Sequence, residues 1–367
     1  MLCENAFDNF SMHYCFSIMR KEGKMDIILK LLLVVAGVLC QIFVSGIDNV
    51  FVQIILLVAG FVLLIKGADW FVEGASKIAD KMGIPQLVIG LTIVAFGTSA
   101  PEAAVSITAA LSGDSVDIAI GNVLGSNIMN ILLILGISCL ICPLAVQKST
   151  QKYEIPFVIL ISVLTLGLGY FDGTIGRVDG AIMLALMVGF VIYLLNMAKK
   201  GQGSVEEGET AGANDTMWKL ICFVIVGGAG IVIGSDVTVD AATKVALHFG
   251  MTEKLVGLTI VAFGTSLPEL ITSTIAAARK KADIAVGNIV GSNIFNLLFV
   301  LATTAVITPL PYFTETTSFV VDNIVAIATA VLLLIGVLNK EQKLKRWCGI
   351  VMVASYGVYF AYLLMTA

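Results

Sequence analysis

The segment GLTIVAFGTSAPE at residues 90–102 is repeated almost unchanged at residues 257–269, where it reads GLTIVAFGTSLPE. Twelve of these thirteen positions are identical. A second segment, DIAIGNVLGSNIMN at residues 117–130, recurs as DIAVGNIVGSNIFN at residues 283–296, with ten of fourteen positions identical. Identity at this level in two separate segments indicates an internal duplication, so the chain contains two copies of one unit.

The duplicated unit covers most of each half of the chain. A weaker match at the same spacing pairs Gly67, Asp69, Val72, Ala75 and Lys77 with Gly234, Asp236, Val239, Ala242 and Lys244. Residues 199–217 are polar and glycine-rich without periodicity, which is typical of a flexible linker. We therefore expect an N-terminal extension at 1–49, a first half at 50–198 (repeat about 67–146), a cytoplasmic linker at 199–217 and a second half at 218–367 (repeat about 234–312).

The composition excludes a soluble protein. Hydrophobic residues make up 58% of the 367 residues, charged residues make up 13%, and the mean hydropathy is +0.98. A soluble globular domain has about a quarter of its residues charged. The net charge of −4 without a basic stripe argues against a nucleic-acid partner. The two histidines and seven scattered cysteines form no zinc or hydrolase motif, so we expect neither an enzyme nor a prosthetic cofactor.

Apolar runs of membrane-spanning length occur along the whole chain. One crossing needs about 20 mostly apolar helical residues, whereas strands of a membrane barrel are alternating segments of about 10. We therefore expect an all-α polytopic membrane protein with two five-helix repeats, that is, a ten-helix core. The basic residues at 20, 21 and 24 precede the first run, which is either an extra N-terminal helix or a signal segment. The expected spans are 26–45, 50–67, 85–111, 117–142, 154–170, 178–198, 218–235, 254–278, 283–306, 317–338 and 347–365.

The distribution of lysine and arginine indicates that the two repeats have opposite orientations. Cytoplasmic loops are enriched in these residues. The loop at 112–116 has no lysine or arginine, but its counterpart at 279–281 is Arg-Lys-Lys. The loop after the first repeat carries Lys148 and Lys152, but its counterpart at 309–317 has no basic residue. Homologous loops therefore lie on opposite sides of the membrane. Inverted repeats with interrupted helices are typical of secondary transporters, whose substrate site lies near the bilayer midplane.

A glutamate lies inside an apolar run of each repeat, at Glu102 and Glu269. An ionised carboxylate at this depth costs about 2.5–3.5 kcal/mol on insertion scales. Neither repeat core contains a lysine or arginine that could pair with it. We therefore expect a bound cation to supply the missing positive charge.

Oxygen-bearing residues surround both glutamates in the sequence. Helical spacing would place the Thr and Ser three and four residues before each Glu on the same face as that Glu. Ser and Asn one turn apart in the second segment add hydroxyl and amide oxygens, and Gly121-x-x-x-Gly125 and Gly287-x-x-x-Gly291 favour close helix contact. The candidate ligands from this pattern are Glu102, Glu269, Thr98, Ser99, Thr265, Ser266, Ser126, Ser292, Asn130 and Asn296.

An all-oxygen set without sulfur or imidazole suits hard cations such as Ca²⁺. Two glutamates carry a charge of −2, which balances one Ca²⁺, two Na⁺ or two protons. A site that different ions neutralise in turn, and that opens to either side, is an antiporter. A cation channel is the alternative from another functional class, and it predicts Ca²⁺ uptake without any counter-ion.

The duplicated motifs G-x-[ST]-x-x-A-x-G-T-S-x-P-E and G-N-x-x-G-S-N-x-x-N resemble the repeats of the sodium/calcium exchanger family, within the cation/calcium antiporter superfamily. The resemblance covers about residues 50–365 and implies a ten-helix core with four helices around the ions. It also implies that the carboxylates and hydroxyls above bind the ions and that Ala95 and Ala262 contribute backbone carbonyls. Many relatives carry Asp at one of the two positions occupied here by Asn130 and Asn296, which leaves the coupling ion and the stoichiometry open.

The sequence thus predicts a multi-pass plasma (inner) membrane antiporter that exchanges Ca²⁺ for Na⁺ by alternating access. H⁺/Ca²⁺ exchange through the same residues is the alternative within this class. Acid pH should compete with Ca²⁺ in either case, because protons bind the same carboxylates. The expected partners are inorganic cations and the lipid bilayer, and the sequence does not indicate an oligomeric state.

Overall fold

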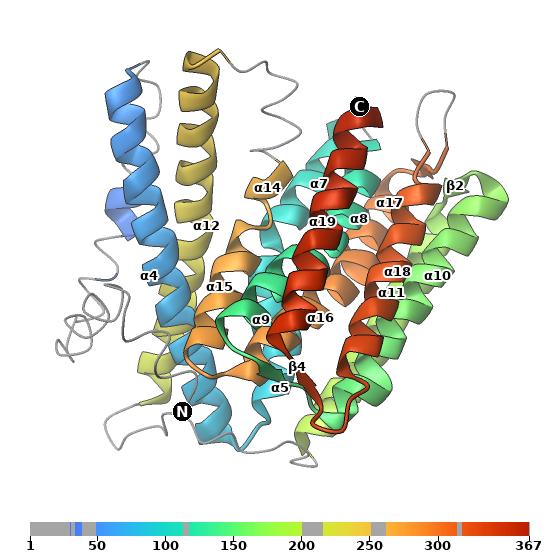
Figure 1. Ribbon diagram of the computed structural model, residues 1–367, viewed down its shortest axis with the longest axis horizontal. Coiled ribbons are helices and arrows are strands. Elements are labelled where there is room, and N and C mark those ends of the chain that lie inside the picture. Colours follow the sequence, from blue (N-terminus) through green and yellow to red (C-terminus); the bar gives the residue numbers. More distant parts are fainter. Residues whose placement is uncertain are drawn as a thin grey trace.

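A computed structural model describes residues 30, 34–38, 49–112, 117–199, 216–250, 262–313 and 318–366. These residues are almost entirely helical (Figure 1). The first half contains α4 (Val50–Met82), α5 (Gln86–Ile89), the π-helix η1 (Gly90–Val94), α6 (Ala95–Thr98), α7 (Ala100–Ser112), α8 (Asp117–Met129), η2 (Asn130–Leu135), α9 (Gly136–Ile141), η3 (Thr150–Glu154), α10 (Ile155–Asp172) and α11 (Arg177–Lys199). The second half contains α12 (Met217–His248), α14 (Ala262–Gly264), α15 (Leu267–Ala278), α16 (Ala282–Phe295), η5 (Asn296–Leu301), α17 (Ala302–Ile307), α18 (Val320–Val337) and α19 (Arg346–Thr366).

The expected membrane spans are present in the part of the chain that the structure describes. Eight helices there are long and apolar enough to cross a bilayer, and the bent unit of 86–98 with 100–111 makes a ninth. The expected tenth crossing includes α14 and α15, but residues 251–261 before them lie outside the described residues. Most of the linker and of the N-terminal extension also lies outside them. Residues 34–38 of the expected extra helix are helical, and Val34 packs in one cluster with Leu63 and Trp70 of α4.

Two spans are longer than the sequence predicted. The runs at 50–67 and 218–235 were expected to end there, but α4 continues to Met82 and α12 continues to His248. Charged residues in the added turns lower the local hydropathy, which is why the apolar runs appear to stop. These charges pair one turn apart on the same helix, since Lys77 bonds to Glu73 at 2.8 Å and Lys244 bonds to Asp240 at 2.7 Å.

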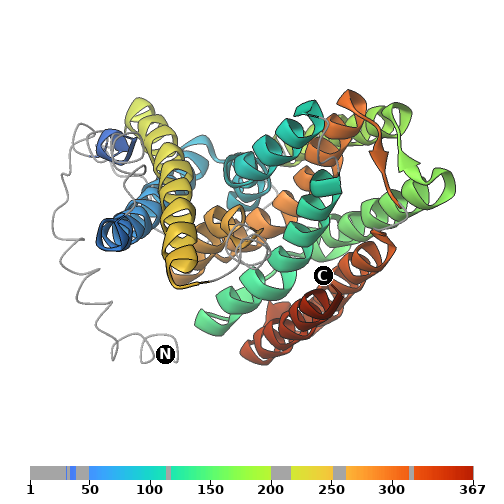
Figure 2. The same ribbon diagram turned by 90° about the horizontal axis from the view of Figure 1, so that it is seen from above.

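Helices α4 and α12 are homologous, and they pack against each other in antiparallel directions. A side chain added at Gly60 would meet Gly234 and Thr238, whereas one added at Gly74 would meet Phe223. The partner numbers fall as the α4 numbers rise, so the two copies run in opposite directions. The pair lies along one edge of the molecule in both views (Figures 1 and 2). This packing is direct structural evidence for inverted repeats.

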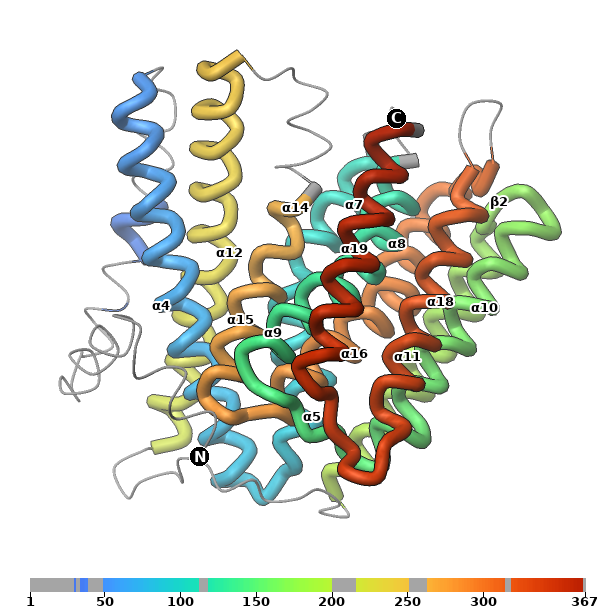
Figure 3. Tube along the Cα trace, in the orientation of Figure 1, coloured from blue at the N-terminus to red at the C-terminus, as the bar shows by residue number. Residues whose placement is uncertain are grey.

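Two short sheets repeat the same inversion. Strand β1 (Leu144–Ala145) pairs with β4 (Lys343–Leu344), and β2 (Thr174–Ile175) pairs with β3 (Leu310–Pro311). Strands β1 and β3 occupy equivalent positions after the second segment of each repeat. Figure 1 labels β4 near the lower end of the molecule, and Figures 1 and 3 label β2 near the upper end. The equivalent strands therefore lie at opposite ends, as an axis in the membrane plane requires.

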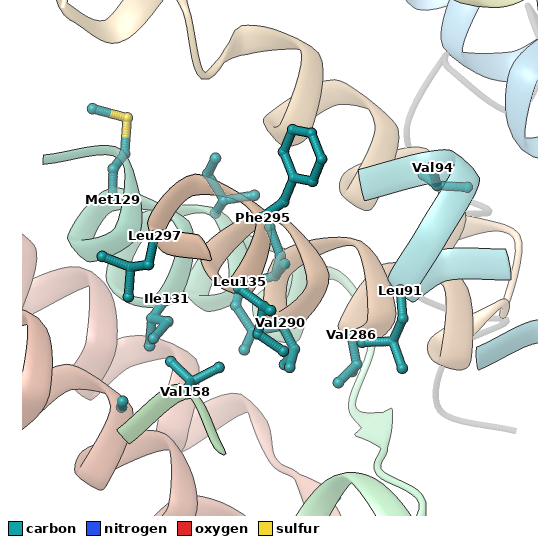
Figure 4. Close-up of a cluster of buried hydrophobic side chains, with 14 of the residues drawn as sticks. Leu91, Val94, Met129, Ile131, Leu135, Val158, Val286, Val290, Phe295 and Leu297 are labelled. Atoms are coloured by element: carbon teal, nitrogen blue, oxygen red, sulfur yellow. The ribbon is translucent and has the colours of Figure 1, made fainter. Parts of the chain in front are cut away.

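The core centres on α16, which is buried along its whole length. Apolar side chains from both repeats surround it, including Val286 and Val290 of α16 with Leu91 of η1 and Leu135 of η2 (Figure 4). This helix holds one of the two duplicated Ser-Asn segments in a fixed position.

The predicted close contacts at the two Gly-x-x-x-Gly motifs are confirmed for the second copy. A Cβ at Gly287 would lie 3.1 Å from Gly90 Cα, and one at Gly291 would lie 2.8 Å from Ala95 Cβ. Within the described residues, a Cβ at Gly121 would meet only Phe319 and one at Gly125 would meet nothing. The segment equivalent to the Gly90 region in the second repeat lies outside the described residues, so close contact by the first copy stays a prediction.

Candidate functional site

The Thr-Ser pair of each repeat falls at a helix break. In the first repeat α6 ends at Thr98, Ser99 has non-helical φ and ψ of −83° and 7°, and the two helical pieces are bent by 47°. In the second repeat Ser266 has φ and ψ of −92° and 4° between α14 and α15. A proline follows in the first turn of the next helix in both cases, where its missing N–H costs no helical hydrogen bond.

The two glutamates lie in the first turn of the helices that follow these breaks. Glu102 is in the first turn of α7 and Glu269 is in the first turn of α15. Free N–H groups and the helix dipole make this position favourable for a negative charge. Both residues are 0% exposed. Neither glutamate takes part in the ion pairs found among the described residues.

The serines at the breaks reach across to the glutamate of the other repeat. Ser99 Oγ donates to Glu269 Oε1 at 2.9 Å, and Ser266 Oγ donates to Glu102 Oε1 at 3.1 Å. The prediction that the Thr-Ser pair shares a helical face with its own glutamate is therefore wrong. The bend at the break turns these hydroxyls away from their own helix and toward the repeat interface.

The serines of the second duplicated segment contact the glutamate of their own repeat. Ser126 Oγ lies 3.4 Å from Glu102 Oε1, and Ser292 Oγ lies 3.4 Å from Glu269 Oε1. Ser266 Oγ is also 3.3 Å from Ser126 Oγ. Side chains from α7, α8, α15 and α16 and from both breaks thus converge on one buried cluster.

The two threonines also contact asparagines of the opposite repeat. Thr98 Oγ1 lies 3.0 Å from Asn288 Oδ1, and Thr265 Oγ1 lies 3.5 Å from Asn122 Oδ1. Asn288 in turn donates to Ser273 at 2.9 Å. Thr98 also hydrogen-bonds Glu269 directly, whereas Thr265 joins the cluster through Asn122. The sequence reasoning did not single out the asparagines of the two Gly-Asn dipeptides.

The backbone carbonyl of Ala95 is engaged within its own helix. It accepts from the Ser99 N–H at 3.0 Å and from Thr98 Oγ1 at 3.3 Å. A carbonyl oxygen has two lone pairs, so a cation could replace the threonine hydroxyl there. Ala262 opens α14, and its side chain lies outside the described residues.

Four asparagines form a symmetric network where the repeats meet. Asn130 Nδ2 donates to Asn293 Oδ1 at 3.0 Å, and Asn296 Nδ2 donates to Asn127 Oδ1 at 3.1 Å. Asn127 Nδ2 donates to the Asn293 carbonyl at 3.2 Å, and Asn293 Nδ2 donates to the Asn127 carbonyl at 3.1 Å. Sequence reasoning missed Asn127 and Asn293. Their presence in the identical Gly-Ser-Asn triplets was the signal that could have identified them.

The helices carrying these asparagines change geometry at the site. The π-helices η2 and η5 begin at Asn130 and Asn296, respectively. π-helical turns inside α-helices occur frequently at functional sites. A π-helical turn begins at the equivalent asparagine in both repeats, which marks Asn130 and Asn296 as the centre of the cluster.

Four buried oxygens in this cluster have no hydrogen-bond partner. They are Glu102 Oε2, Glu269 Oε2, Asn130 Oδ1 and Asn296 Oδ1. Buried acceptors without a donor are unfavourable unless another group satisfies them. Two carboxylates with neutral amide and hydroxyl oxygens form a donor set suited to Ca²⁺ or Na⁺. The described residues contain no cluster of three or more His, Cys, Asp or Glu, so this set depends on neutral oxygens as well as charge.

Known proteins are similar to this chain in sequence and in fold. The family described as "Sodium/calcium exchanger protein" matches residues 52–196 and 219–365. The chain is 44% identical over 269 residues to the "Putative antiporter CaxA" of Alkalimonas amylolytica, covering 70% of this chain and 82% of the relative. It is 31% identical over 349 residues to the "Sodium/calcium exchanger MaX1" of Methanosarcina acetivorans, covering 85% of this chain and 98% of the relative.

A solved structure of the sodium-calcium exchanger NCX_Mj, soaked with zero Na⁺ and Ca²⁺, has a TM-score of 0.74 with this structure at 35% sequence identity. The match covers 86% of this chain and 100% of that chain. The matched family segments include both copies of the duplicated motifs. On this sequence and structural similarity, the chain is a multi-pass membrane transporter and belongs to the sodium/calcium exchanger family.

Proposed function

We propose that this cation/Ca²⁺ exchanger couples Ca²⁺ transport to Na⁺ moving in the opposite direction. The halves 50–198 and 218–367, joined by a cytoplasmic linker at 199–217, would expose one shared site to each side of the membrane in turn. The single observation that carries the proposal is the convergence of two fully buried glutamates, Glu102 and Glu269, on one cluster. Each accepts from a serine of the other repeat and keeps an oxygen that no donor satisfies.

The proposed ligands are the oxygens that converge there. The two carboxylates provide the charge, and Ser99, Ser266, Ser126 and Ser292 contact these carboxylates directly. The amide oxygens of Asn130 and Asn296 accept no hydrogen bond and complete the centre of the proposed site. When a cation binds, four further groups would contact it: the hydroxyls of Thr98 and Thr265 and the backbone carbonyls of Ala95 and Ala262.

The cost of burying two like charges supports obligatory exchange. Without a cation, the site carries −2 in a region shielded from water, which opposes its movement across the membrane. One Ca²⁺ or two Na⁺ remove that charge. A transporter that moves only with its site neutralised exchanges one ion for the other and does not leak.

The test is ⁴⁵Ca²⁺ uptake into liposomes containing the purified protein, with a Na⁺ gradient and a pH gradient imposed separately. We expect uptake when Na⁺ is inside and can leave. Uptake driven by the pH gradient alone would assign H⁺/Ca²⁺ exchange instead. Uptake without any counter-ion would indicate a channel.

The site assignment is tested by Glu102→Gln and Glu269→Gln, each of which should abolish uptake because the site loses half of its charge. Glu154→Gln is the matched control. Glu154 is also a buried glutamate, 1% exposed, with one oxygen that has no hydrogen-bond partner, but it accepts from Tyr193 and from no residue of the cluster. It should retain uptake. Full uptake in either site variant would refute the assignment.

A further inference from the structure

A short stretch ahead of the first repeat packs against the α4–α12 pair. It consists of Lys30 and the helical residues 34–38, and we refer to it as the N-terminal segment. It includes the short dark-blue helix beside α4 at the edge of the molecule (Figures 1 and 2). The segment precedes residue 52, where the match to the exchanger family begins. The ion site therefore does not account for this contact.

The contacts of the N-terminal segment fall on one helical face. Lys30 and Val34 are 5% and 7% exposed, and a Cβ at Gly37 would lie 2.6 Å from Leu63 Cδ2. Positions 30, 34 and 37 follow the i, i+4, i+7 spacing of one side of an α-helix. Val35, by contrast, is 44% exposed. The segment thus turns one side toward the protein and the other side away from it.

The buried side of the segment lies along the seam between the two halves of the chain. Val34 packs in one cluster with Leu63 of α4 and Val226 of α12. The Cβ added at Gly37 would also lie 3.3 Å from Ile233 Cγ2 of α12. A single helical face therefore contacts the first helix of each half.

The side chain of Lys30 is held by the protein. Its Nζ lies 3.1 Å from the centroid of the Phe223 ring of α12 and 5.1 Å from the centroid of the Trp70 ring of α4. The charged side chains close enough to act on it are Glu73, Asp69, Lys219 and Lys77. A lysine near the end of a membrane helix that faces lipid extends its ammonium toward water. Burial against aromatic rings from both halves is instead a cation–π contact of a docked helix.

The order of the contacts gives the direction of the segment. Lys30 lies beside Trp70, whereas Gly37 lies beside Leu63, so the segment runs antiparallel to α4. The C-terminal part of α4 lies on the cytoplasmic side, because it pairs with the basic loop at 279–281. The segment therefore runs from the cytoplasmic side outward, and the basic residues just before it match the charge bias of cytoplasmic segments.

We propose that residues 26–45 form an additional membrane helix that is retained in the mature protein and docks along the seam between α4 and α12. Its role is to hold the first helices of the two halves together. The alternative is a cleaved signal segment, whose removal would leave the contacted sides of Leu63, Trp70 and Val226 to lipid. The proposal goes beyond the exchange activity and does not depend on which ion drives it.

Retention is tested by the intact mass of the protein, tagged at its C-terminus and purified from membranes. We expect a mass that includes residues 26–45, with the chain starting at Met1 or at Met25. A mass that corresponds to a chain beginning after residue 45 would overturn the proposal.

Docking is tested with two neighbouring valines. Val34→Ala removes side-chain volume from the contact with α4 and α12, so it should lower the melting temperature in detergent by about 2–4 °C. Val35→Ala is the matched control, because the same change on the exposed side should leave the melting temperature unchanged. Lys30→Met keeps most of the side-chain length but removes the charge over the Phe223 ring, so it should also lower the melting temperature.

The two measurements address separate parts of the proposal. Equal melting temperatures for the two valine variants would overturn docking even if the segment is retained. A decrease for Val34→Ala and Lys30→Met, together with a mass that includes the segment, supports the whole proposal. Both readouts are independent of transport, so a failure of Na⁺/Ca²⁺ exchange would leave this inference standing.

Discussion

Replacing Asn127 with Ala is the sharpest test of the asparagine network. The change removes the donor to the Asn293 carbonyl at 3.2 Å and the acceptor for Asn296 Nδ2 at 3.1 Å. Both partner atoms remain buried without a replacement. The backbone carbonyl of Asn127, which accepts from Asn293, is retained. The variant thus loses two of the four bonds that join the repeats at this point.

The size of the effect follows from these two bonds. Hydrogen bonds between membrane helices contribute about 0.6 kcal/mol on average and about 1.7 kcal/mol at most. We therefore expect a loss of about 1–3 kcal/mol in the free energy of unfolding. One kcal/mol lowers the melting temperature of a domain of about 150–250 residues by about 2–4 °C, so the expected decrease is several degrees.

The assay is thermal unfolding of the detergent-purified protein, paired with Ca²⁺ uptake in liposomes. Uptake should also fall, because Asn296 loses the acceptor that orients its amide. Asn293→Ala should give a similar decrease by symmetry. Ser138→Ala is the control, since Ser138 donates only within its own helix, to the Ile134 carbonyl at 2.9 Å. Wild-type melting and uptake in Asn127→Ala would refute the network as an organising feature of the site.

Three further predictions concern the rest of the molecule. Gly67→Ala places a Cβ 2.7 Å from the Gly230 carbonyl carbon, and this overpacking should lower the free energy of unfolding by about 1–3 kcal/mol. Gly189→Ala is the control, because a Cβ there has open space and should not destabilise the protein. Equal melting temperatures for the two variants would contradict the α4–α12 packing. Asp69 of α4 forms an ion pair with Arg279, which follows α15. A double-mutant cycle of Asp69→Asn with Arg279→Gln, measured by thermal unfolding, should give a coupling energy of about 0.2–1 kcal/mol. A coupling energy of zero would count against the ion pair. Ca²⁺ uptake should fall as the pH is lowered from roughly 8 to 5, because protons compete for the carboxylate oxygens that the cation must contact, and a flat profile would argue against carboxylate ligands.

Much of the site could be predicted because its residues are duplicated. A carboxylate, a hydroxyl or an amide inside an apolar run is costly, and its recurrence at the equivalent position identifies it as functional. This criterion selected Glu102 and Glu269 and the serines that now contact them. It applied equally to Asn127 and Asn293, and the prediction passed over them because it counted cation ligands and ignored the residues that orient those ligands.

Local helix geometry led to the errors. Spacing along an ideal helix placed Ser99 beside Glu102, but a break at Ser99 directs its hydroxyl to Glu269 instead. Hydropathy ended the span that begins at residue 50 near residue 67, but α4 continues to Met82. Its added turns bury side chains such as Phe71 and Ala79, and Glu73 pairs with Lys77 one turn away. The first error came from assuming an unbroken helix across Ser99, and the second came from taking charged residues as the end of a helix.

The amino-acid sequence by itself determined that this is a membrane protein of two inverted copies with two glutamates in its interior, because hydropathy, repetition and charge bias are properties of the linear chain. The tertiary structure alone decided that each break serine reaches the opposite glutamate and that the four asparagines face one another in one network. Those contacts join residues about 160 positions or more apart. They depend on how two inverted units dock, and spacing within either unit carries no information about that.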